Sequence, residues 1–280
     1  MKADAVVLIA AYNAEATLGD ALLSLFPAKA AFDVVIVDDG SAVPVGSLIA
    51  ANDALAPYAD RLHVLRHTPN RGVIAAANEG LRWALERGYR YIIRMDSDDL
   101  ARSGRIDRQI EFMNRHPEIA VVGSQIKRFG KGLKNLGDSS YPLTHEDIHR
   151  HMRLSASFCN PTLIVRAETF STVGLYDERY QCAEDFDWAW RCVRKVRMAN
   201  LPDFLLDYRV SPGQISTKNR KRQLVSKARV LSRELLRGEI GCLKGLAAIG
   251  ALMFMPLPVK LALQRSMKDW LARKPAGTSS

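Results

Sequence analysis

The sequence is poor in cysteine, with only four in 280 residues, and no two of them form a C-x-x-C pair. No histidine stands at zinc-ligand spacing to any of them. Neither a disulfide framework nor a zinc site is therefore indicated. The first strand-like run follows directly after Lys2 and Asp4, without the basic region, apolar core and cleavage site of a signal peptide. We expect a protein of the reducing cytoplasm rather than one exported through that route.

Glycine-rich phosphate-binding loops are also missing, since the sequence contains neither G-x-G-x-x-G nor G-x-x-x-x-G-K-[ST]. This absence disfavours a dinucleotide-dependent dehydrogenase and a P-loop nucleotide hydrolase. A calcium EF-hand fails as well, because the acidic run that starts at Asp96 has Leu100 in the fifth position and Ala101 in place of the glycine at the sixth. No zinc finger or aromatic-interleaved basic platform occurs, so nucleic acid is not an expected partner.

Basic charge is distributed unevenly along the chain. The sequence has 40 Lys and Arg against 30 Asp and Glu, a net charge of +10. Fourteen of the basic residues but only three of the acidic ones lie in residues 216–280, so the residues before them are close to neutral. The chain therefore divides into a near-neutral body and a basic tail.

Short β-branched runs alternate with segments of helical period over the first hundred residues, which predicts βαβ units and a largely parallel sheet. Leu18, Leu22 and Leu25 mark one face of a helix, and a second helix is expected over roughly residues 74–86. The four expected strands are Ala5–Ile9, Val34–Val37, Leu62–Leu65 and Tyr91–Met95.

Polar residues follow each of these expected strands. The carboxyl ends of parallel strands line one edge of an open sheet, where ligands bind at a topological switch point. Four separate loops are therefore expected to converge on one site. These loops are Ala10–Asn13, Asp38–Ser41, His67–Gly72 and Asp96–Asp99.

The loop after the fourth strand places three carboxylates in four positions, on Asp96, Asp98 and Asp99. A pair at D-x-D spacing suits Mg²⁺ or Mn²⁺, which commonly uses one or two carboxylates and completes its shell with phosphate oxygens. The same residues equally suit an acidic turn or the N-cap of a helix that begins near Ser103. For an isolated D-x-D the capping role is the commoner of the two.

Two other acidic motifs are equally ambiguous when taken alone. Asp38-Asp39-Gly40-Ser41 is typical of a turn with Gly40 at positive φ, or of a carboxylate that accepts hydrogen bonds from a base or ribose. The segment Glu184–Asp187 begins a stretch of helical character. Its acids either complement the helix dipole or include a general base.

Taken in order, five motifs resemble the family 2 glycosyltransferases, which are nucleotide-sugar-dependent enzymes, over roughly residues 5–215. The resemblance implies an α/β GT-A fold, which is a Rossmann-like nucleotide-diphospho-sugar transferase fold. It has a mixed, mainly parallel central sheet, here followed by a C-terminal helical extension. The motifs are Ile9–Asn13, Val35–Ser41, Asn70–Gly72 with Asn78–Gly80, Met95–Asp99 and Glu184–Trp188.

The expected domain division follows from this resemblance. Residues 1–215 form the GT-A catalytic domain, with a nucleotide-sugar-binding half over 1–100 and an acceptor-binding half over 101–215. Within it, Tyr208–Ser216 resembles the strand and loop that close the family's catalytic domain. Residues 216–280 form a basic, partly apolar helical extension.

The resemblance also implies roles for residues near the nucleotide. Ala10 and Tyr12 match the loop that packs on the base, although many relatives have proline at position 10. Asp39 matches the residue that reads uracil, and Asn70 matches one beside the base and ribose. The expected donor is therefore a UDP-sugar.

At the reacting centre, Asp98 matches the ligand of a divalent metal, Mn²⁺ or Mg²⁺, that bridges the donor diphosphate. Asp96 matches a residue that reaches the ribose or the metal shell, and Asp99 is expected to cap or support the loop. Asp185 matches the catalytic base, with Glu184 as a supporting or acceptor-binding acid. The family inverts the anomeric centre by direct displacement.

One departure concerns phosphate or sugar contacts. Many relatives have an arginine immediately before the asparagine of the helix after strand three, whereas Ala77 precedes Asn78 here. The contact is expected either to be absent or to come from Arg71 or Arg105.

The tail suggests contact with a membrane surface. Residues 245–259 form an apolar stretch broken by Pro256 and Pro258, too short for a span of about twenty residues. Beside basic helices, such a stretch suits peripheral attachment to an anionic membrane, and the alternative is a helical appendage packed on the body.

We expect a cytoplasmic enzyme, attached to the inner face of the membrane, that glycosylates a glycan or lipid-linked glycan in bacterial cell-surface polysaccharide assembly. The alternatives are an inactive nucleotide-sugar-binding protein and a sugar-phosphate nucleotidyltransferase, although the latter would need a glycine- and lysine-rich loop near the first strand.

Overall fold

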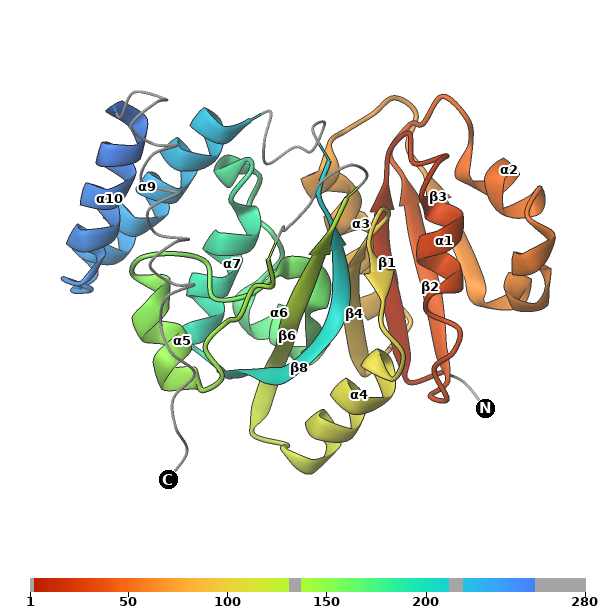
Figure 1. Ribbon diagram of the computed structural model, residues 1–280, viewed down its shortest axis with the longest axis horizontal. Helices are drawn as coiled ribbons and strands as arrows, with labels where there is room; N and C mark the ends of the chain where they lie inside the picture. Colours follow the sequence, from red (N-terminus) through yellow and green to blue (C-terminus); the bar gives the residue numbers. More distant parts are fainter. Residues whose placement is uncertain (1–2, 131–136, 212–218, 255–280) are drawn as a thin grey trace.

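An eight-stranded mixed sheet runs through the centre of the protein, with strand order β3-β2-β1-β4-β7-β6-β8-β5 (Figure 1). The computed structural model describes residues 3–130, 137–211 and 219–254. The chain adds β2 and β3 on one side of β1 and then β4 on its other side. This reversal at β1 is the topological switch point at which a ligand crevice is expected. The strands are β1 Ala5–Ala11, β2 Phe32–Asp38, β3 Leu62–Arg66, β4 Tyr91–Asp96, β5 Leu100–Ala101, β6 Ile119–Phe129, β7 Ile164–Arg166 and β8 Arg197–Arg209.

The first four strands are parallel, as the sequence predicts. β1 pairs with β2 and β4, and β3 pairs with β2. All four predicted runs lie inside observed strands, and β1, β2 and β4 each continue one or two residues further, into Ala11, Asp38 and Asp96. Polar groups therefore begin at the last residue of β2 and β4, at the edge of the sheet.

The other strands reverse direction and extend the sheet. β7 is antiparallel to both β4 and β6, whereas β6 and β8 run parallel through a long, irregular pairing. The short β5 pairs with β8 between Leu100 and Asp207. This pairing brings the chain just after Asp99 onto the end of β8. The sheet as a whole is mixed, and its first half is parallel, as expected.

Helices cover both faces of the sheet because strand side chains alternate between them. Leu8 and Val37 belong to a cluster that includes α3, α7 and α9, whereas Ile9 and Ile36 face a second cluster that includes α1 and α4. The helices of the body are α1 Leu18–Leu23, α2 Val45–Ala50, η1 Asp53–Arg61, α3 Val73–Glu86, α4 Arg105–Arg115, α5 His145–Met152, η2 Asn160–Thr162, α6 Glu168–Val173, η3 Glu178–Tyr180 and α7 Glu184–Val193.

The C-terminal extension forms two helices, α9 Arg220–Leu236 and α10 Cys242–Phe254, which lie together beyond α7 (Figure 1). Leu224, Val230 and Leu231 of α9 are buried in the same cluster as the tryptophans of α7. The extension is therefore helical, as expected, and its first helix packs on the body. Pro256 and Pro258 lie outside the described residues. Within the described ranges, no helix is long and apolar enough to cross a membrane.

Candidate active site

Asp39, directly after β2, organises the loop that follows β3. Its Oδ1 accepts hydrogen bonds from His67 Nδ1 at 2.7 Å and from the Arg71 backbone N–H at 2.8 Å. Its Oδ2 accepts from the Gly72 N–H at 2.8 Å, and its carbonyl accepts from Asn70 Nδ2 at 2.8 Å. A carboxylate offers about four acceptor positions, so one position on Oδ2 is left for a ligand.

The neighbouring Asp38 has a different task. Its fully buried carboxylate accepts from the N–H groups of Ser41 and Val45 and pairs with Arg66 at 2.8 Å. Gly40 takes φ +77°, and an added Cβ would lie 2.8 Å from the Asn70 backbone nitrogen. The turn predicted at Gly40 is therefore confirmed, and it brings the loops after β2 and β3 into contact.

The loop after β1 leaves one aromatic ring in solvent. Tyr12 is 55% exposed, whereas Ala10 is half-buried. The next residue, Asn13, has φ +49° and is held by hydrogen bonds with Ser41 Oγ and the Ala42 N–H. Tyr12 therefore stands beside the Asp39 loop with a free face, a geometry that suits stacking on a planar ring.

The acidic loop after β4 is crowded with like charges. The pKa of Asp96 is raised to about 6, chiefly by burial. The carboxylates of Asp98 and Asp185 contribute to this rise, and Arg94 opposes it. Burial also raises the pKa of Asp98, against the effect of Arg209. Burial is the largest cause of both shifts, and it disfavours the charged form of a carboxylate that has no cation beside it.

Asp99 supports the loop from inside the protein. It is fully buried, and its Oδ1 accepts from the Arg209 N–H at 2.8 Å on β8. Burial and the proximity of Asp96 and Asp98 raise its pKa to about 9. The helix-cap alternative is wrong, because α4 begins at Arg105 with Gly104 as its N-cap. The expectation that Asp99 supports the loop is confirmed.

The first turn of α7 brings two more carboxylates to the same place. Asp185 adds to the electrostatic repulsion at Asp96, and Asp96 does so at Glu184. Burial and the nearby Asp185 raise the pKa of Glu184 to about 7, and its Oε2 has no hydrogen-bond partner among the described residues. The acids of β4 and α7, almost ninety positions apart, therefore share one site.

Arg94 is the cation that most strongly opposes the rise in the pKa of Asp96, and it was not among the site residues predicted from the sequence. It is 3% exposed on β4, and it acts electrostatically on both Asp96 and Glu184. Its guanidinium carbon lies 5.8 Å from the centre of the Tyr176 ring. Its Nε and Nη1 find no acceptor within the described part of the chain. The available signal was a single arginine inside the apolar run of β4.

The two arginines considered for phosphate contacts differ in placement. Arg105 is 1% exposed, and its Nη2 donates to the carbonyls of Arg94 and Pro161. Arg71 lies at the surface, with Nη1 3.3 Å from Glu79 Oε2. Of the two arginines, Arg71 is thus the accessible one.

His67 was not among the site residues predicted from the sequence. It lies buried between Asp39 and Glu79 and contacts both carboxylates.

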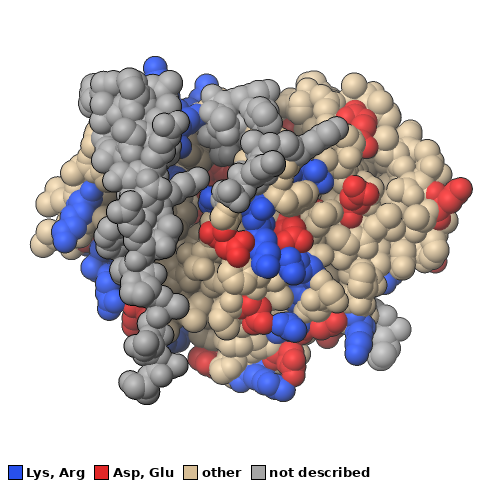
Figure 2. Space-filling view, viewed as in Figure 1, with Lys and Arg blue, Asp and Glu red and all other residues tan. Residues whose placement is uncertain are grey.

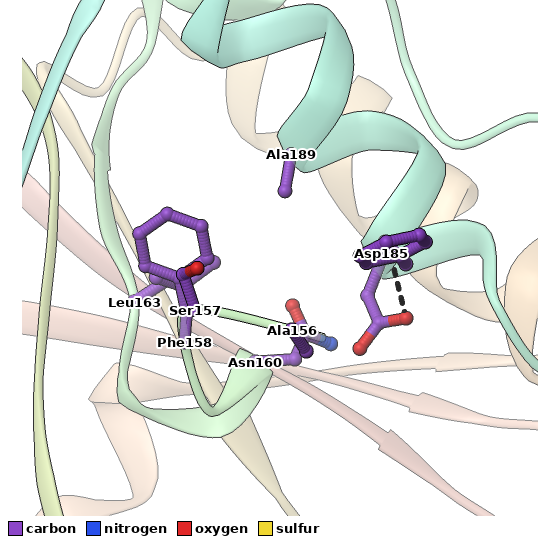
Figure 3. Close-up of a pocket in the computed structure, with 8 residues that line it drawn as sticks. Ala156, Ser157, Phe158, Asn160, Leu163, Asp185 and Ala189 are labelled. Carbon is purple, nitrogen blue, oxygen red and sulfur yellow. Dashed lines mark hydrogen bonds between the residues drawn. The ribbon is translucent and has the colours of Figure 1, made fainter. Parts of the chain in front are cut away.

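A recess of about 270 Å³, counting its solvent-open part, lies beside Asp185 (Figure 3). Asp185 and Ala189 project from α7, and Asn160 lies across from them (Figure 3). Asn160 Oδ1 accepts a hydrogen bond from the Tyr176 hydroxyl at 3.2 Å. The other lining residues are Ala156, Ser157, Phe158, Leu163 and Phe186. The recess is thus mostly apolar, with a carboxylate and an amide at its edge.

The carboxylates at the end of β4 are candidate ligands for a divalent cation. Within the described residues, no group of three or more His, Cys, Asp or Glu side chains is placed to hold a metal ion. Asp96 and Asp98 nevertheless supply hard oxygen ligands with raised pKa values. A cation that takes one or two carboxylates and completes its shell with substrate phosphates fits this set.

Comparisons with known proteins agree with this geometry. Residues 6–172 match the family model described as Glycosyl transferase family 2. An uncharacterized glycosyltransferase of Haemophilus influenzae is 27% identical over 248 residues, which cover 88% of this chain and 89% of that protein. The amylovoran biosynthesis glycosyltransferase AmsE of Erwinia amylovora is 27% identical over 245 residues, with 85% and 88% covered.

Solved structures share the fold. S. aureus TarS 1-349 in complex with UDP-GlcNAc matches with a TM-score of 0.69 at 18% identity, covering 93% of this chain and 78% of that one. The mannosyltransferase PcManGT from Pyrobaculum calidifontis, in complex with GDP-Man and Mn²⁺, matches with a TM-score of 0.61 at 16% identity, covering 98% and 82%. At these identities the likeness supports the GT-A fold alone.

Proposed function

The chain belongs to glycosyltransferase family 2, and from this premise we propose that it transfers a sugar from a UDP-sugar to a hydroxyl of a glycan or lipid-linked glycan. The observation that carries the proposal is the meeting of Asp96 and Asp98 of the β4 end with Glu184 and Asp185 of α7. The first pair suits a donor diphosphate with its cation, and the second suits an attacking hydroxyl.

The uridine is assigned to the loops after β1, β2 and β3. Asp39 keeps one acceptor position, which suits the N–H of a uracil ring. Tyr12 and Ala10 offer a surface for the base, and Asn70, fixed to the Asp39 carbonyl, lies beside the base and ribose in this proposal. These loops converge at the switch point of the sheet, where α/β proteins bind nucleotides.

Asp98, with Asp96 beside it, would hold Mn²⁺ or Mg²⁺ together with the donor diphosphate. When bound, the cation would neutralise the charge that develops on the departing UDP. The carboxylates themselves would gain from the cation, because burial raises the pKa of both, and the charge of Asp98 also raises the pKa of Asp96.

Asp185 is assigned the role of general base. It would take the proton of the acceptor hydroxyl as the oxygen attacks the anomeric carbon from the side opposite UDP. This direct displacement inverts the anomeric centre. Glu184 would hold a neighbouring acceptor hydroxyl, and the recess beside Asp185 would receive the rest of the acceptor sugar.

Attachment to the inner face of the cell membrane completes the proposal. Leu236, Ile240 and Leu243, at the turn between α9 and α10, are 89%, 72% and 53% exposed. Arg237 and Lys244 accompany them at the surface. In Figure 2, basic side chains lie along the left-hand edge, on the side where Figure 1 places α9 and α10. Apolar side chains flanked by cations suit an anionic lipid surface. A lipid-linked acceptor in bacterial polysaccharide assembly would be available there.

The test is release of free nucleotide from a panel of UDP-, GDP- and dTDP-sugars, measured with Mn²⁺ and again with EDTA. We expect turnover of a UDP-sugar that depends on the metal. The Asp185→Asn variant should bind UDP as the wild type does. Its rate of UDP formation from the UDP-sugar should be roughly 10²- to 10⁴-fold lower, which is the usual contribution of a general base. Wild-type rates in that variant would refute the assigned base.

Two outcomes would favour the alternatives. Binding of UDP-sugars without release of UDP, even with a range of glycan acceptors, would indicate an inactive nucleotide-sugar-binding protein. Formation of a UDP-sugar from UTP and a sugar phosphate would indicate a nucleotidyltransferase.

A further inference from the structure

The third acid of the α7 motif, Asp187, has no place in the proposed chemistry. Its side chain is fully buried, and two residues along an α-helix turn the side chain by roughly 200°, so Asp187 faces away from Asp185. Its Oδ2 accepts from Arg191 Nε on the same helix at 2.9 Å. Its Oδ1 accepts from Arg233 Nη1 of α9. The C-terminal extension thus contacts the same helical turn that carries Glu184 and Asp185.

Arg233 is itself fixed by several contacts. Its Nε donates to Glu234 Oε1 at 2.7 Å, and its Nη1 also donates to the Tyr180 hydroxyl at 3.2 Å. Its guanidinium carbon lies 5.3 Å from the centre of the Tyr180 ring. The arginine therefore holds both Asp187 and the segment that leads into α7.

Other contacts bind α9 to the same region. Ser226 Oγ donates to the Gln181 carbonyl at 2.8 Å, and Lys227 Nζ lies 5.5 Å from the centre of the Phe186 ring. Another ion pair joins Arg194, directly after α7, to the fully buried Glu234 at 3.1 Å; it uses Oε2 of Glu234, whereas Arg233 binds Oε1. α9 is therefore attached to α7 at both ends. Two of its described contacts, from Arg233 to Asp187 and from Lys227 to Phe186, reach the turn with the acids, and Arg233 is the one that binds a carboxylate there.

We propose that α9 belongs to the catalytic unit and that Arg233 is a positioning residue, which orients Glu184 and Asp185 toward the acceptor by holding Asp187. A general base must point at the reacting hydroxyl, and a misplacement of about 1 Å can reduce the rate by roughly a hundredfold. The sequence predicted a catalytic domain that ends at residue 215 and a separate tail. In this proposal the catalytic unit instead continues through α9.

The role rests on the proposed function, and the test separates position from stability. In Arg233→Met, Arg191 is the one cation that Asp187 keeps among the described residues, so both the melting temperature and kcat should fall. The double variant Arg233→Met with Asp187→Asn removes both charges and should regain much of the melting temperature. We expect its kcat for UDP release to stay roughly ten- to a hundredfold below wild type, with the donor KM within about twofold. Recovery of kcat together with the melting temperature would overturn the proposal.

Arg194→Met is the matched control, because it cuts an α7–α9 ion pair that does not reach Asp187. It should lower the melting temperature while kcat stays within about twofold of wild type. An equal loss of kcat in this control would also overturn the positioning role. A readout independent of activity is amide hydrogen exchange of residues 184–188, which should be faster in the double variant than in wild type. If wild type releases UDP from no donor, the donor assignment fails, and unchanged exchange would still count against Arg233.

Discussion

Asn78 of α3 pairs with both backbone polar groups of Tyr176, although the two residues lie 98 positions apart. Its Nδ2 donates to the Tyr176 carbonyl at 2.9 Å, and its Oδ1 accepts from the Tyr176 N–H at 3.0 Å. Tyr176 in turn reaches Asn160 with its hydroxyl, and its ring lies near Arg94. Asn78 therefore fixes the backbone of the residue that contacts Asn160 and Arg94.

Replacing Asn78 with alanine should leave the buried N–H and carbonyl of Tyr176 without hydrogen-bond partners. Each unsatisfied buried group costs about 1–3 kcal/mol, so we expect the free energy of unfolding to fall by about 2–6 kcal/mol. Asn78→Asp keeps the acceptor for the Tyr176 N–H, but it sets a carboxylate oxygen against the Tyr176 carbonyl oxygen and buries a charge, so its free energy of unfolding should fall at least as far as that of Asn78→Ala. Urea denaturation of the three proteins tests this order. Equal stability of wild type and Asn78→Ala would contradict the structural role.

The first half of the fold is predictable because its signals are local. Ala5–Ala11 and Tyr91–Asp96 are β-branched or apolar runs that end in polar loops, and parallel pairing carries those loops to one edge. β6 begins with a similar apolar run at residues 119–122, but neither β6 nor β8 was predicted, and their pairing joins residues far apart in the chain. Strand order in that half depends on long-range contacts that no short motif encodes.

The candidate site divides in the same way. Acids such as Asp98 and Asp185 stand out because three carboxylates in four positions are costly unless a cation or a substrate uses them. Arg94 and His67 were missed, since a single arginine in a strand or histidine in a loop has many ordinary roles. Their importance depends on which carboxylates surround them, and only the fold determines that.

Asp98→Asn tests the metal assignment. A neutral amide replaces the carboxylate, and the affinity for Mn²⁺ in the presence of UDP should fall by roughly a hundredfold or more, since even outer-shell partners contribute about 10–100-fold. Calorimetric titration of Mn²⁺ into the UDP-bound protein measures this. Asp203→Asn, which removes a surface ion pair with Arg108, is the control and should bind as wild type does. Unchanged affinity in Asp98→Asn would rule out Asp98 as a ligand.

Glu239, between α9 and α10, should make stability depend on pH. Burial alone would raise its pKa, but His149 at 2.9 Å and Arg153 at 3.0 Å outweigh burial and lower it. A lowered folded-state pKa gives stability that is complete above the unfolded value of 4.5 and is lost as pH falls. Glu239→Gln should therefore melt below wild type at pH 7, and the difference should shrink below pH 4.5. A difference that is constant with pH would argue against the charge as its cause.

Membrane attachment is best tested without truncation, because a chain that ends before α9 would leave Asp187 of the body without Arg233. The double variant Leu236→Ser with Ile240→Ser removes apolar area from the exposed turn and leaves every described contact of α9 with α7 in place. Full burial of one such side chain contributes about 1.5–3 kcal/mol, so binding to vesicles of phosphatidylcholine and phosphatidylglycerol should weaken at least about tenfold. Val64→Ser, at an exposed apolar residue of β3 in the body, should float with the vesicles as wild type does. Binding that survives in the double variant, or that is equally strong on phosphatidylcholine alone, would place the contact elsewhere or exclude the charge as its cause.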